Sequence, residues 1–205
     1  MHISEGVLSA PVLVSGAAFA VAGISVGLKK LDNDRIPQAG ILAAAFFVAS
    51  LVHVPIGPSN VHLVLNGIVG LLLGWAAFPV IAVALVLQGI LFQFGGITTL
   101  GVNTVIMAGP AVACYYLCGP FVEKGNTIAL AGAFACGFMA VLLSALCVAA
   151  ALVLTGEAFL EVSITLVAVH IVVMVIEGIV TMFCVAFLKK VQPAMLAMNR
   201  PIKQK

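Results

Sequence analysis

Long apolar runs separated by short polar breaks dominate the chain. None of these runs contains Lys or Arg. Most are long enough for a helix, which rises about 1.5 Å per residue, to cross a hydrocarbon core of about 30 Å. The pattern predicts about seven membrane spans, at roughly 11–28, 38–53, 61–78, 79–94, 103–122, 127–155 and 160–188.

The weakest boundary in this map is Trp75–Pro79, which allows only a tight turn between the third and fourth spans. We expect an all-α polytopic membrane protein, with 1–190 as a single integral membrane domain and 191–205 as a basic cytoplasmic tail. Composition agrees, because hydrophobic residues make up 63% of the 205 and charged residues only 8%. A soluble domain needs a far more polar surface.

The positive charges define a topology. With seven crossings, all nine Lys and Arg residues fall on one side, which the positive-inside rule makes cytoplasmic. They are Lys29, Lys30, Arg35, Lys124, Lys189, Lys190, Arg200, Lys203 and Lys205. An odd number of crossings then places the N-terminus outside and the C-terminus inside. Membrane topology accounts for the positions of the basic residues, so no nucleic-acid partner is expected.

The N-terminal residues are expected to remain on the mature chain. Residues 1–10 lack the basic start of a secretory signal, and the apolar run continues to Lys29 as a spanning helix would. Met1 should also remain, because methionine aminopeptidases need a small second residue and His2 is large. The five cysteines all lie within spans and are odd in number, so we expect apolar packing rather than disulfides.

Met1-His2 offers three nitrogens to one metal ion: the terminal amine, the His2 amide and the ring nitrogen Nδ1. Flat sites rich in nitrogen favour Ni²⁺ or Cu²⁺. A second imidazole would complete the plane, and the candidates are His53 and His62 on the same side of the membrane. His62 is favoured, because it is expected to open the third span after a rigid turn. The alternatives are a disordered terminus and an interfacial histidine without a ligand role.

Three segments resemble the CbiM/NikM family, the substrate-capture components of energy-coupling factor transporters for cobalt and nickel. They are Met1–Leu8, Pro55–Gly67 and Leu91–Asn103, and the resemblance runs to about residue 188. It implies that Met1, His2 and His62 hold the metal. Ser59-Asn60-Val61 departs from the Thr- or Ser-rich text usual before that histidine, which leaves the hydrogen bonding of the loop open.

The resemblance also implies partners: a membrane coupling (T) component, a pair of ABC-type ATPases and often a small accessory membrane subunit. The function expected is high-affinity capture of Ni²⁺ or Co²⁺ for an ATP-driven importer in a prokaryotic cell membrane, with no resident cofactor. Gly74–Pro79 and Asn66-Gly67 look closer to the nickel branch. A cobalt component linked to cobalamin synthesis is the alternative.

The chain is not expected to be an enzyme. It has no phosphate-binding loop, so the ATPases must be separate chains, and no His-Glu-x-x-His of a metalloprotease. A passive channel or an intramembrane metalloenzyme is the alternative of another class.

Polar residues inside a membrane are costly and need a role. Gln88, Gln93 and Asn103 are candidates for orienting the ligands, with His53 as an alternative ligand. Ordinary hydrogen bonding between helices is the competing interpretation.

The last span carries His170 and Glu177 on one face, and we expect a coupling or structural role for both. Replacement of Glu177 by Gln should leave metal content intact and slow transport. In the first span, Gly16, Ala20, Gly23 and Gly27 form a stripe of small residues that would let another helix approach closely.

Overall fold

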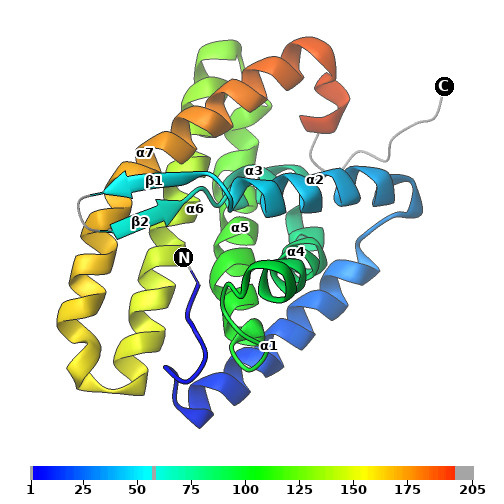
Figure 1. Ribbon diagram of the computed structural model, residues 1–205. Helices are drawn as coiled ribbons and strands as arrows, with labels where there is room; N and C mark the ends of the chain where they lie inside the picture. Colours follow the sequence, from blue (N-terminus) through cyan, green and yellow to red (C-terminus); the bar gives the residue numbers. More distant parts are fainter. Residues whose placement is uncertain (1, 57–58, 197–205) are drawn as a thin grey trace.

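Seven α-helices run through residues 2–56 and 59–196, the part of the chain that the computed structural model describes. Their bounds are α1 Ala10–Lys29, α2 Ile36–Ala49, α3 Asn66–Leu73, α4 Ala77–Phe92, α5 Leu100–Val122, α6 Asn126–Thr155 and α7 Leu160–Val191. An antiparallel hairpin of β1 (His53–Ile56) and β2 (Ser59–His62) lies between α2 and α3 (Figure 1). The expected class of an all-α polytopic membrane protein is confirmed, with this hairpin as a small addition.

Within the described residues, five segments are long and apolar enough to cross a membrane, rather than the seven expected. They are Ala10–Lys29, Asn66–Phe92, Leu100–Val122, Asn126–Thr155 and Glu157–Val191. With 14 residues, α2 is only about 21 Å long, and α3 has 8 residues. Five is also odd, so the argument that places the two termini on opposite sides still holds.

The hairpin corrects the predicted second and third spans. Helix α2 ends at Ala49 and α3 begins at Asn66, so His53 is the first residue of β1 and His62 is the last residue of β2. The sequence had suggested that each histidine lies at the end of a helix, and this prediction was wrong. Pro55 has no N–H for a helix and β-branched Val residues favour strands, and a hydropathy window sees neither effect.

The stripe of small residues on α1 packs inside the molecule. Gly16, Ala20, Gly23 and Gly27 are the buried residues of this helix. A Cβ atom at Gly23 would lie 2.4 Å from the ring of Phe78 on α4, and one at Gly16 would lie 2.3 Å from Val102 on α5. The partner of this face is therefore the chain itself.

Helix α3 is short and lies at the centre of the bundle, where all of its residues are buried. It packs directly against two backbones, because a Cβ atom at Gly67 would lie 2.8 Å from Gly137 on α6 and one at Gly70 only 2.2 Å from the carbonyl oxygen of Ala111 on α5. The Asn66 amide donates to the carbonyl of Met107 (3.1 Å) and to the Ser144 hydroxyl (2.9 Å). These contacts fix the helix that follows β2 and His62.

The turn from α5 to α6 lies at the opposite end of the bundle from the turn between α6 and α7 (Figure 1). Lys189, near the end of α7, reaches the turn between α5 and α6 and donates to the carbonyl of Lys124 there (2.8 Å). Helix α7 ends at Val191, and Pro193–Leu196 forms a short 3₁₀ turn with Leu196 buried. The rest of the predicted tail, 197–205, lies outside the described residues.

Candidate metal centre

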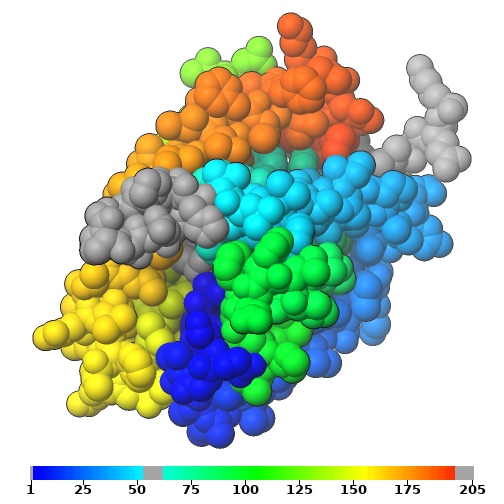
Figure 2. Space-filling model, in the orientation of Figure 1, coloured from blue at the N-terminus to red at the C-terminus, as the bar shows by residue number. Residues whose placement is uncertain are grey.

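The N-terminal segment, residues 2–9, lies in the surface between the end of the α6–α7 pair and the region around residues 90–100 (Figure 2). The amide of Asn103 pairs with the backbone of Ile3 on both sides: Oδ1 accepts from its N–H and Nδ2 donates to its C=O, each at 3.0 Å. Further along, the Ser9 N–H donates to the Thr155 hydroxyl (3.3 Å). Side chains of α5 and α6 therefore fix the backbone of this segment near both of its ends.

Glu5 fastens the same segment to the loop that follows α4. Its carboxylate accepts from the N–H of Thr98 (2.9 Å) and from the Thr98 hydroxyl. These bonds, led by that from the hydroxyl, lower the pKa of the Glu5 carboxyl. The carboxylate is therefore ionised at neutral pH, where it accepts both bonds.

Gly95 and Gly96 allow this close approach. Gly95 has a φ of +79°, and a Cβ atom there would lie 2.8 Å from Nδ2 of Asn103 and 3.8 Å from the His2 ring. A Cβ atom at Gly96 would lie 2.1 Å from the Glu5 side chain. The loop therefore needs glycine on both counts, conformation and space.

His62 ends the hairpin on the other side of the site, and the chain behind it is held by Glu177 of α7. The Glu177 carboxylate is fully buried and accepts from the N–H of Val64 and from that of Leu65 (2.9 and 3.0 Å). Leu65 has a φ of +57° and immediately precedes α3. A negative charge at the start of a helix is stabilised by its unpaired N–H groups and its dipole.

The rings of His2 and His62 meet with their centroids 4.9 Å apart, and Phe94 covers both, its ring centroid 5.7 and 6.2 Å from theirs. Nε2 of His2 lies 2.7 Å from Oε1 of Gln88, and Nδ1 of His62 lies 2.7 Å from the carbonyl oxygen of Leu63. Both oxygens only accept hydrogen bonds, so both of these nitrogens carry the proton.

The remaining two nitrogens, Nδ1 of His2 and Nε2 of His62, face each other at 3.1 Å. With these tautomers both carry lone pairs. Two acceptors cannot bond each other without a shared proton or a cation. Burial lowers the pKa of the His2 imidazole to about 3, the positive amino terminus adds to this, and the bond to Gln88 opposes it. The His2 ring is therefore neutral at neutral pH, which is the form that binds metals.

Not all residues expected at the site are brought together. Met1 lies outside the described residues, as does the side chain of His53, whose backbone pairs with that of His62 across the hairpin. Gln93 is exposed and lines a cavity of about 680 Å³ with Ser4 and Glu5. Among the described residues, no three His, Cys, Asp or Glu side chains form a metal-binding group.

In the part of the chain that the structure describes, neither His170 nor Glu177 forms a hydrogen bond with the two facing ring nitrogens. Nδ1 of His170 donates to the carbonyl of Leu166 in its own helix (2.7 Å), and the ring is buried. The roles expected for both residues stay predictions.

Several residues of the site escaped the sequence analysis. Thr98 and Thr155 hold the N-terminal segment, Phe94 covers the rings, and the Leu63 carbonyl sets the His62 tautomer. Only Glu5 left a signal, as a carboxylate in an otherwise uncharged N-terminal segment. A backbone carbonyl has no residue type and cannot be found by pattern.

Comparison with known proteins identifies the family. Over residues 2–195 the chain matches the family model CbiM, described as the cobalt uptake substrate-specific transmembrane region. The chain belongs to the CbiM family. A Haemophilus influenzae protein named as a candidate metal transport protein is 42% identical to it over 213 aligned positions, which cover 98% of each chain.

Two further relatives bear on the CbiM assignment. The fused nickel transport protein NikMN of Rhodobacter capsulatus is 41% identical over 121 positions, 55% of this chain and 35% of that protein. The crystal structure of a transition metal transporter superposes with a TM-score of 0.72 and 26% identity, covering 93% of both chains.

Membership in the CbiM family confirms that the chain is a transporter subunit and not an enzyme, in a nickel and cobalt transport family. With its apolar helices it is a multi-pass protein of a prokaryotic cell membrane. CbiM proteins are the substrate-binding components of transport systems, which implies membrane and ATPase partners.

Proposed function

We propose that this CbiM protein captures a divalent transition metal ion, Ni²⁺ in preference to Co²⁺, as the substrate-binding component of an ATP-driven importer of the energy-coupling factor type. The ligands are the Met1 amine, the amide nitrogen and Nδ1 of His2, and Nε2 of His62. The captured ion is the substrate, and it is released inside when partner subunits reorient the protein.

The observation that carries this proposal is the approach of two ring nitrogens, Nδ1 of His2 and Nε2 of His62, to 3.1 Å, while the other nitrogen of each ring donates to an oxygen. Two nitrogens that each bind a divalent ion at about 2.0–2.1 Å, at right angles, lie about 2.9 Å apart. The observed separation is close to that of two adjacent metal ligands. A cation between them removes the conflict between the two acceptors.

The tautomer of His2 supports chelation by the N-terminus. Gln88 occupies Nε2 and leaves Nδ1 free. Only Nδ1 can close a six-membered ring through a metal with the amide nitrogen of the same residue. A nitrogen plane completed in this way favours Ni²⁺. Cobalt is the second candidate, because the matching family model is described by cobalt uptake.

The energy must come from other chains. The sequence has no phosphate-binding loop. The proposed partners are a membrane coupling (T) component and a pair of ABC-type ATPases, with a small accessory membrane subunit in some assemblies.

Metal content and affinity of the purified protein test the proposal. We expect one Ni²⁺ per chain, and a dissociation constant raised at least about 100-fold by His62→Ala, since changes behind the ligands alone cost 10–100-fold. One extra residue before Met1 should have a similar effect, because it removes the amine from its place beside the His2 amide. His170→Ala is the matched control, since its ring bonds within α7, and should bind normally. Normal binding by the extended protein would refute capture through the amine, and tighter binding of Co²⁺ would refute the nickel assignment.

A further inference from the structure

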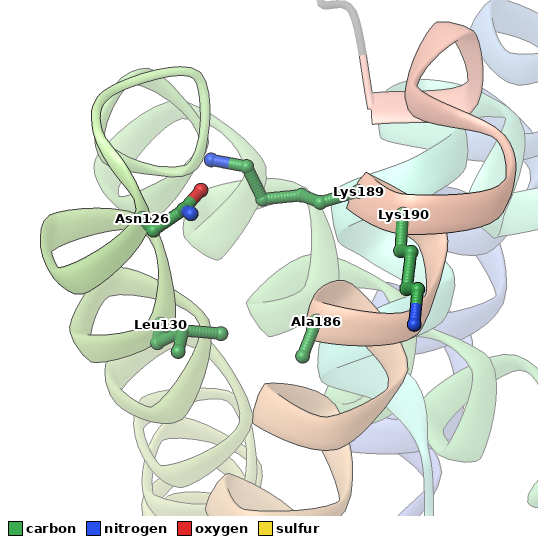
Figure 3. A pocket seen from close by; sticks show the side chains of 5 residues that line it. All are labelled: Asn126, Leu130, Ala186, Lys189 and Lys190. Atoms are coloured by element: carbon green, nitrogen blue, oxygen red, sulfur yellow. The ribbon is translucent and has the colours of Figure 1, made fainter.

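A second cavity lies far from the two histidines, where α6 begins and α7 ends. It has a volume of about 380 Å³ and is lined by Asn126, Leu130, Ala186, Lys189 and Lys190 (Figure 3). Leu130 and Ala186 are its apolar lining residues, Lys189 reaches across towards Asn126, and the Lys190 side chain points to the other side (Figure 3). The metal site uses none of these residues.

The two lysines differ in their bonds. The Lys189 ammonium donates to the carbonyls of Lys124 (2.8 Å) and Val122 (3.5 Å) and so closes the C-terminal end of α5. An ammonium has three N–H donors, so one remains. Lys190 is exposed and has no hydrogen-bond or charge partner in the part of the chain that the structure describes. The cavity therefore has one fixed and one free positive charge.

An apolar surface continues along α7 from these charges towards the middle of the membrane. Phe183 lies seven residues before Lys190, two turns away on the same side of the helix. It is 65% exposed and Phe187, between them, is 62% exposed. Cationic groups above an exposed apolar helix face match an amphiphile with an anionic head and a hydrocarbon chain.

We propose that this cavity binds the headgroup of an anionic phospholipid, with one acyl chain lying along Phe183 and Phe187. The phosphate contacts the remaining N–H of Lys189, and the exposed Lys190 side chain turns towards it. Both lysines lie at the end of a membrane-spanning helix, which is the depth of lipid phosphates, and basic pockets between helices at that depth bind anionic lipids. A free phosphate ion fits the charges but makes no use of the apolar face.

Native mass spectrometry of the purified full chain tests the proposal, by titration with phosphatidylglycerol and, in parallel, with phosphatidylcholine of the same acyl chains. We expect phosphatidylglycerol to bind more tightly, and Lys190→Gln to weaken its binding about fivefold, the effect of one basic residue near the surface. Lys30→Gln removes an equal charge outside the cavity and should leave the binding unchanged. Leu130→Trp fills the cavity, keeps both lysines and should also weaken binding.

Four results would overturn the proposal. One is equal binding of the two lipids by the unaltered chain. Another is equal loss in the Lys190→Gln and Lys30→Gln variants, which would show a diffuse surface charge. The third is thermal stabilisation by millimolar inorganic phosphate equal to that by phosphatidylglycerol, which would make the site a phosphate site. A loss of partner assembly in Lys190→Gln with unchanged lipid binding would assign the cavity to a protein instead.

Discussion

The side-chain amide of Gln88 decides which nitrogen of His2 is free. It is fully buried on α4, and its Oε1 accepts a hydrogen bond from Nε2–H of His2 at 2.7 Å, so Nδ1 faces His62. Partners of this kind orient a ligand without touching the metal. The role proposed for Gln88 can therefore be separated from that of the ligands.

Replacement of Gln88 by Leu should raise the dissociation constant for Ni²⁺ by about 10–100-fold, since the His2 ring loses its fixed tautomer and orientation. Titration of the purified variant measures this. Gln93→Leu is the matched control, because Gln93 is exposed and the structure shows no bond from its side chain to either ring. Equal losses in both variants would contradict the assignment.

Glu177 is tied to His62 through two backbone N–H groups, and this changes what its replacement should do. Glu177→Gln keeps one acceptor oxygen but turns a donor amide towards the chain at Leu65. A hydrogen bond to a charged group contributes about 1.5–3 kcal/mol. We expect a lower unfolding temperature and a raised dissociation constant for Ni²⁺, whereas the sequence alone suggested intact metal content.

The matched control for this change is Glu161→Gln, an exposed carboxylate at the start of the same helix. It should alter neither quantity. An unchanged dissociation constant in Glu177→Gln would restore the expectation from sequence, in which this carboxylate affects transport alone.

At the scale of elements, α3 is held by contacts between backbones. A Cβ atom at Gly70 would lie 2.2 Å from the carbonyl oxygen of Ala111, and a backbone in mid-helix cannot move aside cheaply. Gly70→Ala should therefore destabilise the protein by about 1–3 kcal/mol, measured by thermal unfolding in detergent. Gly40→Ala on α2, where a Cβ atom meets nothing within 4 Å, should be neutral or stabilising. A matching loss at Gly40 would show that glycine in a helix matters here for flexibility and not for space.

The long helices were predictable because apolar runs of 20 to 30 residues have few alternatives in a membrane. The expected first, fifth and sixth spans agree with α1, α5 and α6 to within a few residues. The region from His53 to Asn66 was not predictable, because an average of hydropathy along the chain does not distinguish a short strand from the end of a span. The small-residue stripe of α1 was visible in the sequence, but its neighbours Phe78 and Val102 were not.

At the site, the residues carrying unusual chemistry were found and the geometry was not. His2, His62, Gln88 and Asn103 were named from their types and positions, and the structure places all four around the N-terminal segment. The tautomers depend on which oxygen each ring meets, and these are Oε1 of Gln88 for His2 and the carbonyl of Leu63 for His62. The first contact joins residues 86 positions apart and leaves no local pattern, and the second is to a backbone carbonyl, which has no residue type.

For the whole molecule, the distribution of charge gives a topology that can be tested. Reporter fusions should place the C-terminus in the cytoplasm, with green fluorescent protein active there and alkaline phosphatase inactive. A fusion in the turn after Thr155 should behave in the opposite way, because α7 separates the two points. The same reporter active at both points would rule out α7 as a crossing, and the reversed pattern would place the N-terminus inside.

The length of α7 has a mechanical consequence. Its 32 residues make a rod of about 48 Å, with Lys189 and Lys190 at one end and Glu177 near the middle. The Glu177 carboxylate holds Val64 and Leu65, the residues that follow His62 in the chain. Because a helix is stiff, we expect that a partner protein that tilts α7 from its basic end would move Glu177 as well, and with it the segment that positions the His62 ring.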